Sequence, residues 1–292
     1  MTVEDPKKPP ILFNKPVSGF FRERIRPIAP ALVLLAFSGM LALAVLWWVM
    51  PVGVDWEFTF SQIPKIWRDP YQLWLFANPP WIMALLPHAW LPLRLGNALN
   101  FLLNIVLIIV AVRAAGGGRM ALALTLTSPL FFDLARTNNV DWIPLLGFVI
   151  GPAWGLPFLA AKPQALGGAA VVWVADALRR RAWRVFLPLA AVLLVSFAWG
   201  FWPAHLNIPK DVMWNFAPWP WGLPLGGWLL YRAVKNNDPY LGAASTPFLV
   251  PYLAPYSAAG LFGLAAARWP RVAQVIWVAL WMYLIVSIRR GG

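Results

Sequence analysis

Long apolar stretches separated by short polar or basic segments dominate this chain. Residues 28–50 run for 23 positions without a charge, which is enough for a helix to cross a hydrocarbon core about 30 Å thick. Residues 94–112 form a second uninterrupted stretch. This pattern predicts an all-α, polytopic membrane protein with about 10–11 transmembrane helices. The other apolar stretches are shorter or interrupted by proline, and they cover residues 120–134, 142–154, 156–178, 184–202, 218–234 and 241–288.

The basic segments predict how the chain is oriented. Residues 1–27 carry several Lys and Arg, and we expect this basic N-terminal segment in the cytoplasm, because cytoplasmic segments beside spans are enriched in these residues. Residues 28–292 are then one multi-pass domain in the plasma (inner) membrane. The segment 51–93 lies outside in this arrangement. It mixes aromatic and charged residues with prolines, so we expect interfacial helices there rather than a straight span.

A helix break near Lys162 decides the topology of the middle of the chain. Lys162, Pro163 and Gln164 interrupt the stretch 156–178. Without a turn there, the basic cluster 179–184 would face outside, against the cytoplasmic bias of Lys and Arg. We therefore prefer a turn, which places Lys162 near the outer face and leaves only a very short arm before it.

Composition narrows the class of protein and of chemistry. Hydrophobic residues make up 60% of the chain and charged residues only 12%. In soluble domains about a quarter of the residues are charged, so this composition indicates a membrane protein. The chain has no Cys and two His, which excludes thiolate chemistry and a histidine-rich metal site. Its net charge of +13 lies in loops beside apolar stretches, so we expect membrane lipids and no nucleic acid as partners.

Charged side chains that can act chemically gather on the expected outer face. Asp55, Glu57 and Asp141 are carboxylates that can act as a general base, and Asp55 is the first choice. Each position also has a plain structural interpretation. Asp55 and Asp141 can cap helices, and Lys162 can extend toward the membrane interface. The cations that can bind a phosphate are Lys162, Arg136 and Arg68, while His205 fits an ordinary loop residue better.

Transfer of a sugar from a lipid phosphate would use such residues together. A carboxylate deprotonates the acceptor hydroxyl, cations stabilise the departing phosphate, and an apolar groove holds the lipid tail. The aromatic segment 71–90 is a candidate lining for that groove. Composition alone does not choose between a transferase and a transporter.

The order of several short motifs resembles that of the GT-C fold glycosyltransferases, and most closely the polyprenol-phosphate-mannose-dependent alpha-mannosyltransferases and their uncharacterised bacterial relatives. The motifs together cover roughly residues 28–288. One departure is Asn138-Asn139, where the family usually has Gly-Asn. The matching motifs are Asp55-Trp56, Pro70-Tyr71, Phe76-Ala77-Asn78-Pro79-Pro80-Trp81, Ser128-Pro129, Asn138-Asn139-Val140-Asp141, Lys162-Pro163-Gln164, Ala217-Pro218-Trp219-Pro220 and Pro251-Tyr252-Leu253-Ala254-Pro255-Tyr256.

The resemblance implies a GT-C-like fold and an enzyme that moves a hexose, most often mannose, from a polyprenyl-phosphate donor to a lipid or glycan acceptor outside the membrane. The catalytic aspartate of the family maps onto Asp55, a second acidic element onto Asp141, and the lysine before proline onto Lys162. The expected donor-binding set is Lys162, Arg136, Arg68, Gln164 and His205, with Glu57 as a further catalytic candidate and with neither cofactor nor metal.

Two alternatives remain open at this point. The first is a non-catalytic scaffold that keeps the fold and assembles with other membrane subunits; the chain is shorter than typical family members and rich in tryptophan, with 20 Trp. The second is a transporter or flippase for a lipid-linked sugar. Such proteins are commonly built from two related halves, and no internal repeat is visible in the sequence.

Overall fold

The computed structural model describes residues 28–73, 76–200 and 215–289, with only the backbone for residues 28–37. Within these ranges the structure contains 14 α-helices and several short 3₁₀ helices, and no strand. The expected all-α class is therefore confirmed for the described residues. The chain divides into two compact units, residues 1–45 and 46–292, and everything described below about the site lies in the second.

Two of the described helices are long and apolar enough to cross a membrane, α5 (Leu93–Ala114) and α15 (Pro270–Arg289). A third span results if the neighbouring helical segments Ser38–Val49 and Val54–Ile66 form one broken crossing. The first of these segments belongs to α2 (Ile28–Val49), the helix that the first apolar stretch predicts. The number of 10–11 spans expected from the sequence stays a prediction.

Between α2 and α5 the chain folds into short helical turns around a buried aromatic core. Proline opens most of these turns, because its fixed φ suits the first helical position and its missing N–H is not needed there. The core contains Trp56, Phe60, Phe76 and Met83, all at most 1% exposed. Short helices instead of a straight span are thus confirmed here, while their place at the interface stays a prediction. The turns are α3 (Val54–Phe58), η1 (Phe60–Gln62), α4 (Ile63–Ile66), η2 (Pro70–Gln72), η3 (Pro80–Leu85) and η4 (Pro87–Trp90).

Breaks between the middle helices fall at a glycine and at two residues that precede a proline, which disfavours the helical conformation of the residue before it. Ser128 caps the N-terminus of α7 by accepting from the backbone N–H of Phe131, Gly151 has a φ of 88°, and Lys162 separates α9 from α10. The helix break expected at Lys162 is confirmed. The stretch 120–134, expected as one run, is two helices. The helices of this region are α6 (Arg119–Leu126), α7 (Pro129–Thr137), α8 (Trp142–Ile150), α9 (Pro152–Ala161) and α10 (Pro163–Arg179).

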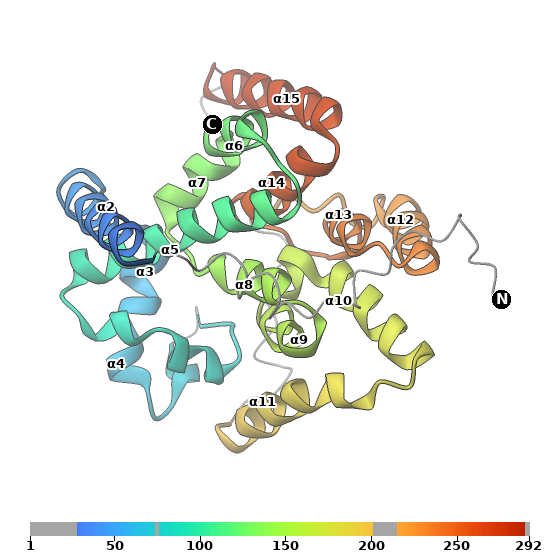
Figure 1. The fold of residues 1–292 in the computed structure, drawn as a ribbon, viewed down its shortest axis with the longest axis horizontal. Helices are drawn as coiled ribbons and strands as arrows, with labels where there is room; N and C mark the ends of the chain where they lie inside the picture. Colours follow the sequence, from blue (N-terminus) through green and yellow to red (C-terminus); the bar gives the residue numbers. More distant parts are fainter. Residues whose placement is uncertain (1–27, 74–75, 201–214, 290–292) are drawn as a thin grey trace. The chain divides into compact units, whose positions relative to one another are not determined.

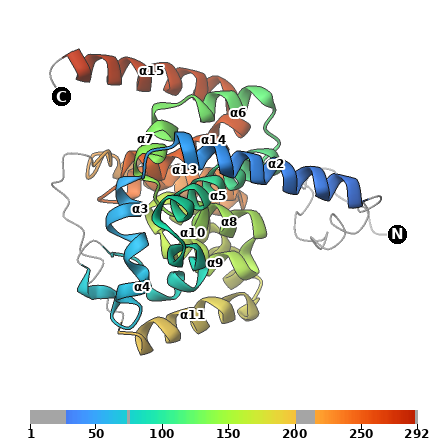
Figure 2. The ribbon, with the colours of Figure 1, turned by 90° about the vertical axis from the view of Figure 1, so that its left-hand side faces the viewer.

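The last third of the described chain continues with η5 (Trp183–Phe186) and α11 (Leu187–Ala198), and resumes after the undescribed segment with α12 (Leu223–Asn236) and α13 (Pro239–Leu249). The short turn η7 (Pro255–Ser257) follows, then α14 (Ala258–Arg268) and α15. Helix α15 packs on α14, α6 and α7, as Figure 2 shows. The sequence predicted one bent span or two short ones before a final span, and the structure has two short helices there.

Helices α10 and α13 lie side by side in the second unit (Figure 1). Their backbones come close together at two glycines, Gly168 and Gly242. A Cβ at position 168 would collide with the carbonyl oxygen of Gly242 and lie 2.6 Å from the Oγ of Ser245. Small residues at this crossing are therefore required by the backbone distance, as in close helix pairs generally.

Substituting Gly168→Ala is expected to destabilise the protein by about 1–3 kcal/mol, since overpacking forces the two backbones apart. The matched control is Gly227→Ala on α12, where an added Cβ meets nothing within 4 Å and alanine favours the helix. Thermal unfolding in detergent measures both. Equal unfolding midpoints for the two variants would contradict the close packing described here.

Candidate functional site

A row of three asparagines on α5 forms the base of the candidate site. Asn97, Asn100 and Asn104 are spaced by three and four residues, so they share one face of the helix, and each is at most 2% exposed. Burying polar side chains of an apolar helix costs free energy unless they form hydrogen bonds. Many of their hydrogen bonds are made with Asn138 and Asn139, in the segment between α7 and α8, which the row therefore holds in place.

The segment between α7 and α8 is a tight turn built on Asn138. This residue has φ 51° and ψ 47°, the left-handed conformation that asparagine tolerates better than most residues. Its Nδ2 donates to the Oδ1 of Asn97 at 2.7 Å, and Asn100 donates to its Oδ1 at 2.9 Å. Asn104 donates to the carbonyl of Asn139 at 2.7 Å. These bonds leave the Asn139 side chain free to point away from α5.

Asp55 reaches this turn from the first turn of α3. The residue before the helix, Gly53, donates its N–H to Asn97 at 2.9 Å, and any Cβ at Gly53 would collide with Asn138. The asparagine row thus anchors both sides of the site. The N-cap of α3 is Gly53, and no side chain caps the helix, so Asp55 does not serve as its cap.

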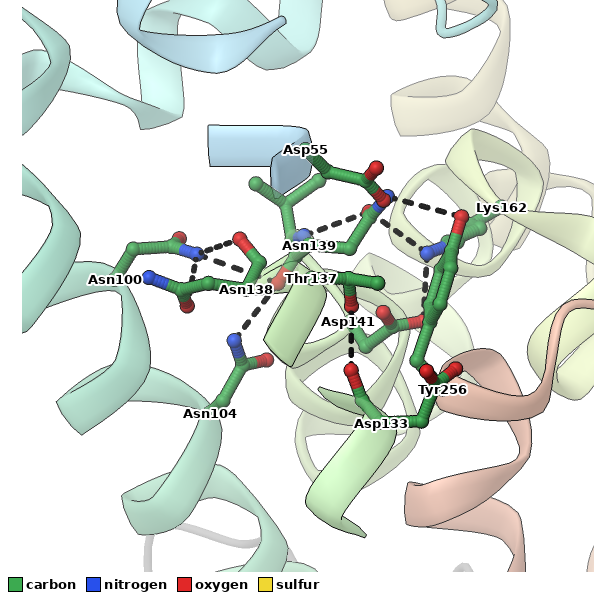
Figure 3. Close-up of polar contacts among 11 residues, drawn as sticks. Asp55, Asn100, Asn104, Asp133, Thr137, Asn138, Asn139, Asp141, Lys162 and Tyr256 are labelled. Atoms are coloured by element: carbon green, nitrogen blue, oxygen red, sulfur yellow. Dashed lines mark hydrogen bonds and ion pairs between the residues drawn. The ribbon is translucent and has the colours of Figure 1, made fainter. Parts of the chain in front are cut away.

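Four elements bring a carboxylate, an amide, a cation and a phenol together (Figure 3). Asn139 donates from Nδ2 to the Oδ2 of Asp55 at 2.6 Å and to the hydroxyl of Tyr256 at 3.3 Å. Lys162, at the break between α9 and α10, donates to the Oδ1 of Asn139 at 2.8 Å. The same ammonium lies 2.7 Å from the Oδ1 of Asp141 and 4.8 Å from the ring centre of Tyr256.

The orientation of the Asn139 amide follows from its neighbours. Its Oδ1 faces two groups that can only donate, the ammonium of Lys162 and the backbone N–H of Val140 at 2.7 Å. The NH₂ group must therefore face Asp55. Because an N–H is aimed at the Oδ2 of Asp55, that oxygen has to accept, and a proton taken up by Asp55 is placed most favourably on Oδ1.

Burial raises the pKa of Asp55 above its usual value of 3.8, and the neighbouring charge of Asp141 adds to this effect. Hydrogen bonds from Asn139 and Tyr256 and the charge of Lys162 oppose the shift but do not cancel it. Desolvation disfavours the charged carboxylate. Asp55 lies on a five-residue helix outside the two long apolar helices. A raised pKa makes it a stronger base than an exposed aspartate.

The sign of this shift predicts how stability depends on pH. The folded state holds the Asp55 proton more tightly than the unfolded state, so Asp55 stabilises the fold at low pH and loses that contribution as pH rises through its folded pKa. We expect Asp55→Asn to raise the thermal midpoint at pH 7, and the gain over wild type to shrink as pH falls. A series of thermal scans from pH 4 to pH 8 measures this. A gain that grows on acidification would contradict the assignment.

Asp141 is placed differently from Asp55. It occupies the N-cap position of α8 but makes no side-chain capping bond, so the capping interpretation does not hold for its carboxylate. Both Asp141 and Lys162 are at most 5% exposed. The Oδ2 of Asp141 and the Oγ of Ser257 find no hydrogen-bond partner among the described groups, and both residues line a cavity of about 10 Å³. That volume admits one water molecule and no sugar ring.

The chain matches no protein-family model, no characterised protein and no solved structure. A function for it has to be inferred from the geometry of the site and from the order of its sequence motifs.

The other described residues singled out from the sequence lie outside this cluster. Arg136 pairs with Asp133 at 2.7 Å on the surface of α7, and Arg68 lines a separate groove on the first loop. Glu57 and Gln164 make no side-chain hydrogen bond or ion pair with any cluster member among the described contacts. His205 lies outside the described residues. Of the predicted set, the structure unites Asp55, Asp141 and Lys162.

Asn139, Tyr256 and the asparagine row were not assigned a role from the sequence. The row carried a readable signal, since three asparagines at helical spacing in an apolar stretch mark one buried polar face. Asn139 and Tyr256 lie in quoted motifs, but they are 117 positions apart, and nothing in the sequence pairs them. Among the described residues no group of three or more His, Asp or Glu side chains is arranged to hold a metal ion.

Proposed function

We propose that the protein is a membrane glycosyltransferase that moves a hexose, mannose by resemblance, from a polyprenyl-phosphate donor to a lipid or glycan acceptor. Asp55 acts as the general base. The observation that carries the proposal is the Asp55–Asn139 hydrogen bond at 2.6 Å, held in turn by a buried ammonium. A carboxylate that is partly accessible, oriented by a fixed amide and raised in pKa has the properties that general-base catalysis requires.

In the proposed reaction Asp55 takes the proton of the acceptor hydroxyl. The acceptor oxygen forms a bond with the anomeric carbon while the bond from that carbon to the phosphate oxygen breaks, and its electron pair leaves with the polyprenyl phosphate. Lys162 supplies positive charge against the negative charge that develops on the leaving phosphate. Asp141 keeps Lys162 in position, and Asn139 fixes which oxygen of Asp55 takes the proton.

The expectations about fold, orientation and donor-binding residues are consistent with this proposal. The fold is GT-C-like with about 10–11 spans, in which pairs of short helices complete crossings that neither helix makes alone. The site faces the outside of the plasma membrane, and the N-terminus faces the cytoplasm. Arg136, Arg68, Gln164 and His205 remain candidates for contacts with the donor, and Glu57 remains a second carboxylate on the same loop.

The test is transfer of radiolabelled sugar in proteoliposomes that contain the purified protein. A panel of polyprenyl-phosphate donors, with mannose, glucose and galactose, is offered with a membrane lipid extract as acceptor. Labelled product above that of empty liposomes is expected with at least one donor. A folded protein that transfers no sugar from any donor would overturn the proposal.

One observation favours a scaffold as the second candidate. Lys162 and Asp141 neutralise each other in a buried ion pair. Such a pair can have a purely structural role and need not bind any substrate. In that case the protein co-purifies with other membrane subunits, and substitutions at Asp55 leave the function of the complex unchanged. Pull-down from native membranes, followed by the assay above on the isolated chain, separates the two candidates.

A further inference from the structure

Two cations and two indole rings line a groove on the first loop, apart from the Asp55 cluster. The groove has a volume of about 440 Å³, within the range of about 300–1,000 Å³ that small-ligand sites occupy. None of the described hydrogen bonds or ion pairs connects its cations to Asp55, Asn139 or Lys162. It is lined by Pro64, Lys65, Trp67, Arg68 and Trp90.

The aromatic side of the groove is fixed in place. Trp67 makes edge-to-face contacts with Trp90, at 5.1 Å between ring centres, and with Trp199, at 5.0 Å. The indole N–H of Trp199 donates to the carbonyl of Trp67 at 3.1 Å. Trp90 itself is half exposed. The rings therefore present a rigid apolar surface rather than a mobile one.

The charged side of the groove keeps its positive charge. Lys65 donates to the neutral Oε1 of Gln62 at 2.8 Å, and neither Lys65 nor Arg68 takes part in any ion pair among the described residues. The neighbouring carboxylate of Asp69 accepts from Gln72 at 3.0 Å instead. Two uncompensated cations at one rim attract an anion, and a phosphate suits both of them.

The groove lies next to the N-terminus of α5. Trp90 ends η4, and α5, one of the two helices long enough to cross a membrane, begins at Leu93. Leu91 and Leu93 are 40% and 39% exposed, so apolar surface continues from the groove onto the helix. Tryptophan and cationic residues at such a boundary lie at the level of the lipid head groups.

From this combination we propose that the groove is a binding site for the head group of an anionic glycerophospholipid. Lys65 and Arg68 hold the phosphate, while Trp67 and Trp90 contact the glycerol and the first acyl carbons. The site goes beyond the proposed transferase and does not depend on it, because its cations and rings are separate from the Asp55 cluster. Arg68, named above as a candidate contact with the sugar donor, is assigned here to the phospholipid instead. It would keep the first loop docked on the membrane surface beside α5.

The experiment is photo-crosslinking of the full chain in nanodiscs of phosphatidylcholine that contain a low fraction of phosphatidylglycerol with a diazirine in its head group. Mass spectrometry of the peptides locates the label. Wild type is expected to carry it on the segment 64–68 or at Trp90. Lys65→Gln with Arg68→Gln is expected to lower this labelling about 25-fold, since each cation near an anionic lipid contributes roughly a factor of five.

Matched variants make the result decisive. Arg232→Gln with Lys235→Gln removes two cations at the same spacing from α12 and is expected to leave labelling of the groove unchanged. Lys65→Arg with Arg68→Lys keeps the charge and is expected to keep the label. Single substitutions give intermediate losses, which separates weakened binding from misfolding.

Three outcomes would overturn the proposal. The first is unchanged labelling of the groove in the doubly substituted protein. The second is equal labelling by a diazirine-bearing phosphatidylcholine, which would remove the role of net charge. The third is displacement of the probe by polyprenyl phosphate at lower concentration than by phosphatidylglycerol, which would assign the groove to the sugar donor instead.

Discussion

Replacing Asp55 by asparagine is expected to lower kcat for sugar transfer by about 10²–10⁴-fold, the usual contribution of a general base. Asparagine has nearly the same shape and still accepts from Asn139 through its amide oxygen. The substitution therefore removes the basic oxygen and leaves the local packing intact. KM for the donor should change little, because Asp55 acts on the acceptor hydroxyl. Steady-state kinetics in proteoliposomes measure both constants.

The matched control for this variant is Asp69→Asn. Asp69 lies on the same loop but is exposed, and its carboxylate bonds only to Gln72 among the described contacts. Its substitution should therefore leave kcat within about twofold of wild type, as expected for a surface change. The two aspartates differ in burial and in their partners, not in chemistry. Equal effects of the two substitutions would remove Asp55 from the mechanism.

The second large effect is expected from Lys162→Met, which should destabilise the protein by about 3–5 kcal/mol. Lys162 is 6% exposed at its side chain and pairs with Asp141, which is 3% exposed. Removing the ammonium leaves a buried carboxylate without its counterion and takes away a donor from Asn139. Denaturant unfolding in detergent micelles, followed by circular dichroism, measures the free energy of unfolding.

A double substitution separates the ion pair from simple packing. Lys162→Met with Asp141→Leu removes both charges and should recover most of the lost stability, since a buried pair can be replaced by apolar residues at little net cost. Arg136→Met is the exposed counterpart, because its pair with Asp133 lies at the surface. This control should change stability by no more than about 1 kcal/mol. A double variant as unstable as Lys162→Met alone would contradict the account.

The general class of the fold was readable from the sequence because apolar runs and prolines act locally. The run 28–50 predicted α2, the run 94–112 predicted α5, and Lys162-Pro163 predicted the break between α9 and α10. Helix lengths elsewhere were harder to predict. The stretch 120–134 was expected as one run, but α6 ends at Leu126 and a new helix begins after Ser128, which caps it, with Pro129 at its first turn.

The site was predictable only in part, for a similar reason. Asp55, Asp141 and Lys162 stood out as charges beside apolar stretches, where an ionised group has a high desolvation cost. The residue that connects them, Asn139, is neutral and has no such signal. Its role appears only when Asp55 and Lys162, which are 107 positions apart, meet on opposite ends of its amide. The local pattern of apolar and polar residues does not show which distant residues will be in contact.

The dependence of the transfer rate on pH tests the central claim most directly. If Asp55 is the base, the wild-type rate falls as pH drops through a pKa above the usual 3.8 of aspartate, because the protonated carboxyl cannot accept the acceptor's proton. The Asp55→Asn protein should keep only a small residual rate without this acid limb. The same acid limb in both proteins, or no transfer by wild type at any pH, would contradict the assignment of Asp55 as the catalytic base.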